Sequence, residues 1–323
     1  MALCVAIGGK LMAGQALAFD IEAHRGGRAL FPENTLVAFA NALSIGVDTL
    51  ELDIGVTQDG AIVISHERGL NPDLALGPDG KYVAAPGTPF VQLTLDEVKK
   101  FDVGRIRPGS RYAAQFPDQK PVPGTGIPTL KELIGLVRKS GDSHVRLNIE
   151  TKIDPDRPDE SPEPERFVAL LLELLRAEDF ESRVMVQSFD WRTLRLVQKL
   201  APKIPTVYLT VQAGSAPTVF LDKASAWSAG FNPSDHGRSL PRTIKAAGGA
   251  IWSPYFGDVT PELISQSHAL GLQVVVWTVN KPADMKRLIA MGVDGIISDS
   301  PDLLRKAAAE SGIALPVGSK VAP

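Results

Sequence analysis

Residues 50–66 read LELDIGVTQDGAIVISH, and this stretch says more about the fold than any other part of the chain. Two runs of alternating apolar residues flank Asp59-Gly60, which is a strong signal for a β-hairpin with a two-residue loop. In that register Asp53 lies opposite His66, and opposed residues of an antiparallel pair point to the same side. Because side chains alternate along a strand, Glu51 shares the face of Asp53. The stretch therefore predicts that Glu51, Asp53 and His66 converge.

Two carboxylates on one face of a strand repel each other unless a positive charge lies between them. A single divalent cation would meet this need. The only cysteine is Cys4, which excludes a cysteine-based zinc site. Oxygen ligands favour Mg²⁺ or Ca²⁺ over zinc. The Glu51-x-Asp53 pattern alone is more often an incidental surface feature, and the returning histidine is what favours a metal site.

The sequence alternates between short β-branched runs and helix-like stretches from residue 21 onward. We expect eight strands, at 21–24, 49–56, 145–149, 184–187, 206–209, 250–253, 273–277 and 295–298. Apolar periodicity predicts helices at 36–43, 129–138, 165–176, 191–200, 261–270 and 283–291. Eight alternating units indicate one closed (β/α)8 TIM barrel. An open doubly wound sheet is the second choice, because the G-x-G-x-x-G turn that it would carry is absent.

Three segments fall outside this alternation. Residues 67–127 are rich in Gly and Pro and are expected to form an insertion after the second-strand hairpin, with one short helix at 95–101 that begins with a capping box. The barrel domain is expected to span 19–310, and 311–323 a loosely ordered tail. Residues 1–18 are apolar and end in Ala16-Leu17-Ala18, which favours a signal peptide and export, periplasmic or secreted, over the cytoplasm, although Lys10 is atypical.

Polar side chains follow several predicted strands, at the end of a barrel where catalytic residues gather. Glu150 would add a third carboxylate to Glu51 and Asp53, and Lys152 shares its side of the strand. Arg25 and Lys152 supply positive charge that suits a phosphate group. His24 and His66 have the right chemistry for a general acid and general base pair. Gln187 and Trp277 end two further strands on the same rim.

The charge balance points to a small-molecule partner. Lys and Arg number 34 and Asp and Glu 37, a net charge of −3, so there is no basic surplus of the kind that nucleic-acid binding requires. No run of 18 apolar residues is present, so no transmembrane segment is expected. The oligomeric state stays open.

Several motifs together resemble the glycerophosphodiester phosphodiesterase family, from about residue 24 to residue 301. The opening block is the most specific: HRG at 24–26, PENT at 32–35, ELD at 51–53, TQDG at 57–60 and HE at 66–67. Later and individually weaker matches are ETK at 150–152, SF at 188–189, WTVN at 277–280 and DGIISD at 294–299. The residues after Glu67 depart from the family's Arg-Thr pair, which leaves the preferred alcohol group open.

The resemblance implies a TIM barrel with an insertion after the His66 strand, and hydrolysis of a glycerophosphodiester to glycerol 3-phosphate and an alcohol. It implies that Glu51, Asp53 and Glu150 bind a divalent cation and that His24 and His66 exchange protons. Substrate and phosphate binding would fall to a further group: Arg25, Lys152, Glu33, Asn34, Gln187 and Trp277.

Three alternatives remain at this point. A phospholipase D-like or sphingomyelinase-like enzyme would share the two histidines and the carboxylate-bound metal. A barrel could also bind phosphodiesters without hydrolysing them. A glycosidase would use two carboxylates across a cleft, but it would leave His24 and His66 without a purpose. We assign no role to His144, His236 or His268.

Overall fold

The fold is a closed barrel of eight parallel strands, seen in a computed structural model that describes residues 19–213 and 216–323. Strand β1 (Asp20–Ala23) pairs with both β2 (Thr49–Val56) and β9 (Gly295–Ser298), which closes the sheet. The other barrel strands are β4 (Arg146–Thr151), β5 (Val184–Ser188), β6 (Thr206–Thr210), β7 (Ile251–Pro254) and β8 (Gln273–Val276). The predicted TIM barrel is confirmed, and closure excludes the open sheet. The predicted leader at 1–18 lies outside the described residues.

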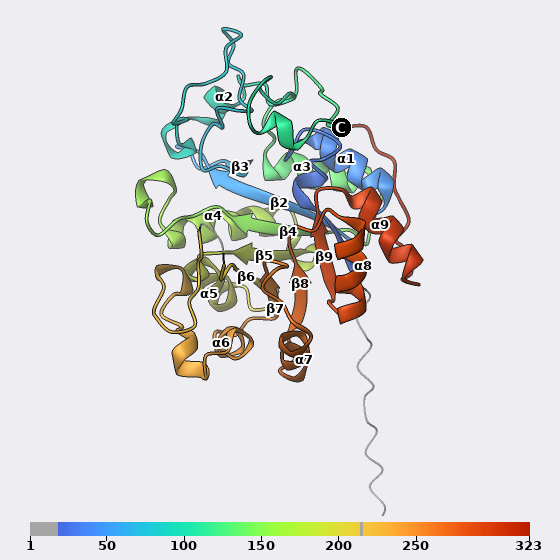
Figure 1. Cartoon of the computed structure of the whole chain (residues 1–323). Helices are drawn as coiled ribbons and strands as arrows, with labels where there is room; N and C mark the ends of the chain where they lie inside the picture. The colour runs from blue at the N-terminus through green and yellow to red at the C-terminus, as the bar shows by residue number, and fades with distance from the viewer. Residues whose placement is uncertain (1–18, 214–215) are drawn as a thin grey trace, which may run out of the picture.

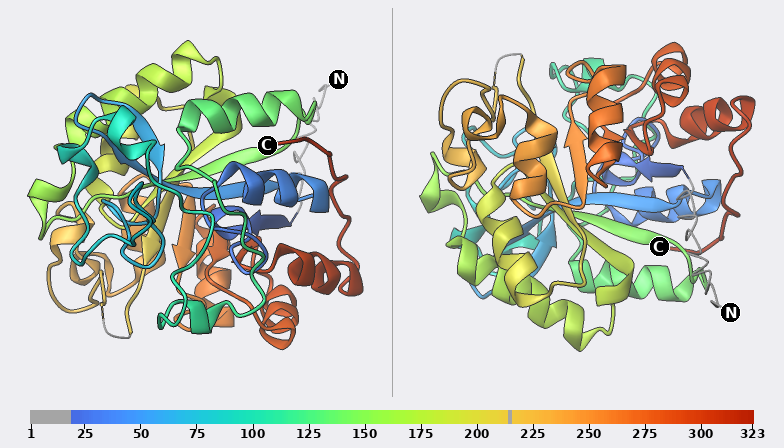
Figure 2. Two further views of the ribbon diagram at one scale, coloured as in Figure 1. Left: turned by 90° about the horizontal axis from the view of Figure 1, so that it is seen from above. Right: turned by 90° about the horizontal axis from the view of Figure 1, so that it is seen from below.

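The helices lie around the outside of the barrel, as Figures 1 and 2 show. Those expected from periodicity are α1 (Leu36–Ile45), α3 (Leu130–Lys139), α4 (Pro164–Ala177), α5 (Trp191–Leu200), α7 (Pro261–Ala269) and α8 (Pro282–Met291), and α2 (Leu95–Val98) carries the capping box. Two helices were not predicted: α6 (Leu240–Ala246) and α9 (Pro301–Glu310). Every helix among the described residues is too short or too polar to cross a membrane.

Two apolar layers hold the barrel together. Side chains such as Val186 and Trp252 face outward and pack against the helices, while a smaller cluster that includes Met185, Val207 and Ile251 alternates with them along the same strands. Alternation places this second cluster inside the barrel. The interior is therefore filled with side chains, and chemistry is confined to the rim, as in other TIM barrels.

The β2–β3 hairpin differs from the predicted register by one residue. Strand β3 (Ile62–Ile64) pairs Ile64 with Ile54, so Ser65 and not His66 lies beside Asp53. The loop contains three residues, because Thr57 pairs with Ala61 and Gly60 takes a positive φ of 84°. Such a loop shifts the register from that of a two-residue turn. His66 therefore reaches the site from the segment after β3.

The insertion at 67–127 follows this hairpin and lies beside it, over one side of the barrel (Figure 1). It contains its own small apolar cluster around Leu70, Phe90 and Val98, which packs on Val63 of β3. The chain after α9 lies against α1, where the Ser319 amide donates to the Leu43 carbonyl at 2.8 Å. Arg305 also binds the Pro316 carbonyl at 2.6 Å. The tail expected to be loose is thus held by defined contacts.

A polar group lies beneath the rim. Glu22 on β1 is fully buried and accepts a hydrogen bond from Asn148 Nδ2 at 2.9 Å. Its neighbour Asp20 pairs with Arg146 at 2.5 Å and accepts from Thr49 at 2.8 Å. Burial and the nearby Asp20 charge raise the pKa of Glu22 well above its ordinary value. Glu22 therefore stays protonated to a higher pH in the folded protein than in the unfolded chain.

Glu22→Gln should remove part of the pH dependence of stability. A raised folded-state pKa stabilises the fold below the ordinary carboxyl pKa, and this contribution is lost as the pH rises through the folded value. Glutamine can accept the same Asn148 bond and cannot ionise. In urea titrations, the free energy of unfolding of the wild type should therefore fall relative to that of the variant as the pH rises above the ordinary carboxyl pKa of about 4 and through the folded-state value. The exposed Glu173→Gln serves as control; parallel curves for Glu22→Gln and wild type would contradict the assignment.

Candidate active site

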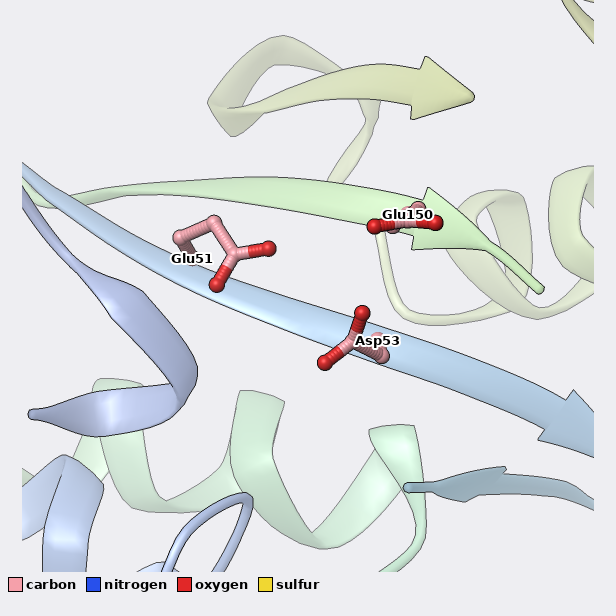
Figure 3. A group of neighbouring side chains, drawn as sticks. All are labelled: Glu51, Asp53 and Glu150. Carbon is pink, nitrogen blue, oxygen red and sulfur yellow. The ribbon is translucent and has the colours of Figure 1, made fainter. Parts of the chain in front are cut away.

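Three carboxylates meet at the rim, two from β2 and one from β4. Glu51 and Asp53 project to the same side of β2, and Glu150 lies next to Asp53 in the register of the parallel pair (Figure 3). Glu51, Asp53 and Glu150 each offer an oxygen within 4.8 Å of the others, and all three are buried. The convergence of Glu51 and Asp53 predicted from strand alternation is therefore present, and Glu150 joins them.

Because the three carboxyl groups are buried close together, the pKa of each is shifted from its ordinary value. Burial and the charges of Asp53 and Glu150 raise the pKa of Glu51 well above its usual range. Burial raises the pKa of Glu150 to about 7, and the neighbouring Asp53 charge adds to this effect, while Lys152 opposes both. For Asp53, the positive charges around it outweigh burial and hold the pKa well below normal, with Lys152 the strongest of them. The raised pKa values of Glu51 and Glu150 and the positive charge of Lys152 thus reduce the repulsion among the three carboxylates.

The donor set fits a hard divalent cation. All three ligands are carboxylate oxygens, which suit Mg²⁺ or Ca²⁺. Asp53 Oδ1 is buried and accepts no hydrogen bond among the described residues, although Lys152 Nζ lies 3.5 Å away. A buried carboxylate oxygen without a hydrogen bond is costly, and a bound cation would satisfy it. Glu51, Asp53 and Glu150 are therefore the residues that could hold the metal.

His24 follows β1 in a short 3-10 turn (His24–Gly26) and is held by Asp299. Its Nδ1 lies 2.5 Å from Asp299 Oδ1, and its Nε2 lies 3.9 Å from Glu51. Asp299 also accepts hydrogen bonds from Arg28 Nε at 2.6 Å and Asn280 Nδ2 at 2.7 Å. Burial is the largest effect on His24 and lowers its pKa to about 4, although Asp299 opposes it. The imidazole is therefore neutral at pH 7.

Arg25 is oriented toward the acidic cluster by an unusual backbone. It adopts a positive φ of 50°, and the following Gly26 has a φ of 80°, where an added Cβ would lie 2.9 Å from the Ala38 side chain. Arg25 Nη1 donates to Glu33 at 2.9 Å, and Arg25 Nε lies 3.4 Å from Asp53. Opposite it, Lys152 Nζ lies 2.8 Å from Glu150 and 3.5 Å from Asp53. Two cationic side chains thus flank the acidic cluster.

Three residues expected to bind substrate contact other side chains of the site in this structure. Asn34 Nδ2 donates to Asp53 Oδ2 at 3.0 Å, and Gln187 Nε2 donates to Glu51 Oε1 at 2.6 Å. Glu33 binds Arg25 and accepts from the Tyr112 hydroxyl. All three are buried. In this structure they orient the carboxylates and the arginine.

A cavity of about 150 Å³ joins these groups, and both histidines line it with Glu51, Glu150 and Gln187. The His66 side chain is 32% exposed, and its Nδ1 lies 3.0 Å from Glu67. Burial lowers the pKa of His66, as do the charges of Arg25 and Lys152, while Asp53 and Glu67 oppose this. His66 thus reaches the site despite the changed hairpin register.

Trp277 forms an aromatic wall of the same cavity. Its ring centroid lies 5.4 Å from that of Phe189 in an edge-to-face arrangement, and its Nε1 donates to the Ser253 carbonyl at 2.9 Å. The indole orientation is therefore fixed, with its polar atom satisfied by the protein.

Sequence analysis missed the roles of Asp299, Arg28 and Tyr112. Asp299 comes directly after the last barrel strand, the position from which other strands deliver their site residues, so a search of strand ends could have found it. Tyr112 lies in the insertion, whose sequence has no apolar periodicity from which the direction of a side chain could be predicted. Its hydroxyl contacts Glu33 and accepts from Arg28 Nη1 at 3.2 Å. The insertion thus contributes to the charged network at the rim.

Comparison with known proteins is consistent with this geometry. Residues 24–303 match the profile of the Glycerophosphoryl diester phosphodiesterase family. The chain belongs to this family. It is 31% identical over 288 residues to a glycerophosphodiester phosphodiesterase of Caldanaerobacter subterraneus subsp. tengcongensis, across 87% of this chain and 94% of that protein. It is 32% identical over 282 residues to the same enzyme of Bacillus altitudinis, across 87% and 95%.

This chain has the same fold as a protein of Silicibacter pomeroyi DSS-3 that is known from a crystal structure. That protein is assigned as a glycerophosphoryl diester phosphodiesterase. The TM-score is 0.81 at 34% identity, across 93% of this chain and 96% of that one. The family resemblance seen in the sequence motifs is confirmed.

A divalent cation should stabilise the wild-type protein through the acidic cluster. Millimolar Ca²⁺ or Mg²⁺ should raise its melting temperature, and Glu51→Gln should abolish most of this rise. Glu51 is a suitable position because burial and the charges of Asp53 and Glu150 raise its pKa and so favour its neutral form without metal, a form that glutamine resembles. The exposed Glu173→Gln should respond as the wild type does. Equal stabilisation of Glu51→Gln and wild type would place the cation elsewhere.

Proposed function

We propose that this chain hydrolyses glycerophosphodiesters to glycerol 3-phosphate and an alcohol, with a divalent cation and with His24 and His66 as the proton-transfer pair. The single observation that carries this proposal is the shared cavity: both histidines, two of the three buried carboxylates and Arg25 line one space of about 150 Å³. The membership of the chain in the glycerophosphoryl diester phosphodiesterase family supports the substrate class.

The phosphate group is the part of the substrate that the site suits best. Arg25 carries a planar guanidinium that suits phosphate oxygens, and its ion pair with Glu33 fixes its direction. Lys152 adds a second positive charge on the other side of Asp53. A cation held by Glu51, Asp53 and Glu150 would neutralise negative charge on the phosphoryl oxygens and lower the pKa of a bound hydroxyl. The diester would thus lie with its phosphorus among these groups.

His24 would act as the general base. Its neutral form has a proton on Nδ1, which Asp299 accepts, and this leaves the Nε2 lone pair facing the Glu51 side of the cavity. Nε2 would take the proton from the attacking hydroxyl, which is the neighbouring glycerol hydroxyl when a cyclic phosphodiester forms first. The new phosphorus–oxygen bond forms as the bond to the alcohol breaks.

His66 would act as the general acid. It lines the same cavity as His24. Burial and the charges of Arg25 and Lys152 lower its pKa, and Asp53 and Glu67 act in the opposite direction to favour the protonated form. It would donate a proton to the departing alcohol oxygen. Water then opens the cyclic ester with the two roles exchanged, which releases glycerol 3-phosphate and restores both histidines.

His24→Gln and His66→Gln should each lower kcat by about 10²- to 10⁴-fold on a glycerophosphodiester, because each removes a positioned proton carrier. Release of glycerol 3-phosphate measures the rate, and circular dichroism checks the fold. The matched control is His144→Gln, an exposed histidine that precedes β4 at the opposite end of the barrel. Folded His24→Gln and His66→Gln proteins with wild-type rates would refute the two-histidine mechanism.

Asp299→Asn should lower kcat while the fold is retained, because an asparagine amide donates to His24 Nδ1 and favours the wrong tautomer. We expect a loss of about 10- to 10³-fold in kcat, below the largest effects known for such pairs, with a smaller change in KM. The ¹⁵N shifts of His24 report the tautomer directly. Asp294→Asn, which removes an ion pair to the surface residue His268, is the control. An unchanged tautomer with unchanged kcat would remove Asp299 from the mechanism.

A further inference from the structure

A second and larger cavity lies beside the active site. It has a volume of about 750 Å³, and Phe189 and Trp277 line both this cavity and the small one that holds the histidines. Trp227 and Tyr255 add two more aromatic side chains to its wall. We call this space the aromatic groove, defined by Phe189, Trp227, Tyr255, Trp277, Asp154 and Asp156. A substrate group attached to the phosphate could extend into it past the two shared rings.

The rings of the aromatic groove are held in place by the protein. Trp277 lies at the centre, with the Phe189 ring 5.4 Å away at 86° and the Tyr255 ring 5.8 Å away at 64°. Tyr255 also packs on Phe256 at 4.8 Å. Edge-to-face packing fixes ring directions without covering every face. The faces that remain uncovered present the negative side of the aromatic quadrupole, which attracts cations.

The charged side chains described in the lining of the aromatic groove are all acidic. Among the described residues that line it are two carboxylates, Asp154 and Asp156, and no Lys or Arg. Asp154 is paired with Arg68 at 3.4 Å, whereas Asp156 takes part in no ion pair in the part of the chain that the structure describes. The groove therefore combines negative aromatic faces with a free carboxylate.

A third cavity, of about 440 Å³, adjoins the active site and shares Arg25, Arg28 and His66 with it. It is lined largely by the insertion, and its charged lining mixes four arginines (Arg25, Arg28, Arg68 and Arg157) with three carboxylates (Glu67, Asp73 and Glu160). Arg68 pairs with Glu160 at 2.6 Å and with Asp154 of the aromatic groove at 3.4 Å. Arginine side chains suit hydroxyl and phosphate oxygens, whereas the described lining of the aromatic groove includes no Lys or Arg.

We propose that the aromatic groove binds the alcohol group of the substrate when that group carries a positive ammonium charge, above all a quaternary ammonium. This inference rests on the proposed function and specifies its substrate class. The methylated ammonium would lie against the aromatic faces with Asp156 as counter-charge, a recurring mode of recognition for such cations. A neutral polyol would gain nothing from the aromatic faces as a cation does, and an acyl chain would bury the two carboxylates at a cost.

The test compares two diesters that differ only in the alcohol: glycerophosphocholine, whose alcohol is a quaternary ammonium, and glycerophosphoglycerol, whose alcohol is uncharged. The wild type should show the higher kcat/KM for glycerophosphocholine. Tyr255→Leu should lower that value by about 3- to 30-fold, and Asp156→Asn by a few-fold, while kcat/KM for glycerophosphoglycerol stays within about twofold. Asp159→Asn, an exposed carboxylate in the same loop but outside the groove, should change neither.

A binding measurement that needs no turnover separates the proposed function from the groove assignment. Tetramethylammonium binding is measured by NMR saturation transfer on the wild type and on Tyr255→Leu. Binding that Tyr255→Leu weakens, in a protein that hydrolyses neither diester, would refute the proposed function and support the groove. Hydrolysis of both diesters with equal kcat/KM, or equal losses on both in Tyr255→Leu, would overturn the groove assignment and leave the function intact. A loss confined to a lysophosphatidylcholine substrate would also overturn it, because an acyl chain would then occupy the groove.

Discussion

Mutual repulsion among three buried carboxylates is the constraint on which the rest of the site depends. Glu51, Asp53 and Glu150 converge within 4.8 Å in a place where water cannot screen them. Three features of the surrounding residues reduce this repulsion. Lys152 stands between Asp53 and Glu150, Arg25 approaches Asp53 from the other side, and the raised pKa of Glu51 lets it hold a proton. A divalent cation would neutralise the carboxylates more completely. Arg25 and Lys152 would then be available to bind an anionic substrate. Charge compensation and substrate binding are thus two uses of the same side chains.

The barrel explains how distant parts of the chain supply this site. Parallel strands end at one rim, so β1, β2, β4, β5 and β8 deliver residues to a single cavity from positions that span most of the sequence. The insertion adds what the barrel cannot, because Tyr112 binds Glu33 and so helps to hold Arg25 from outside the rim. The loops form two larger cavities that adjoin the active-site cavity. One contains four arginines, and the other is lined by aromatic and acidic side chains. In our proposal, these loops select the substrate.

Local sequence rules predicted most of the barrel but not all of the site. Strand alternation was sufficient to place Glu51 beside Asp53, and the eight alternating units predicted the closed sheet. The hairpin register was wrong because Gly60 allows a three-residue loop, a choice that Asp-Gly alone does not reveal. Helix α6 was missed because its seven residues show little periodicity. Asp299 and His24 lie 275 positions apart, so their contact depends on barrel closure between β1 and β9. Tyr112 lies in a segment rich in glycine and proline. This segment has no repeating apolar pattern, so the direction of the Tyr112 side chain could not be predicted.

The proposed chemistry depends above all on the binding of a divalent cation by Glu51, Asp53 and Glu150. Crystals soaked in Mn²⁺, with diffraction data collected at the manganese absorption edge, test this directly. We expect one strong anomalous peak at about 2.0–2.6 Å from oxygens of Glu51, Asp53 and Glu150, with the Lys152 ammonium moved away from Asp53. A peak on other residues, or no peak at the cluster in well-ordered soaked crystals, would contradict it.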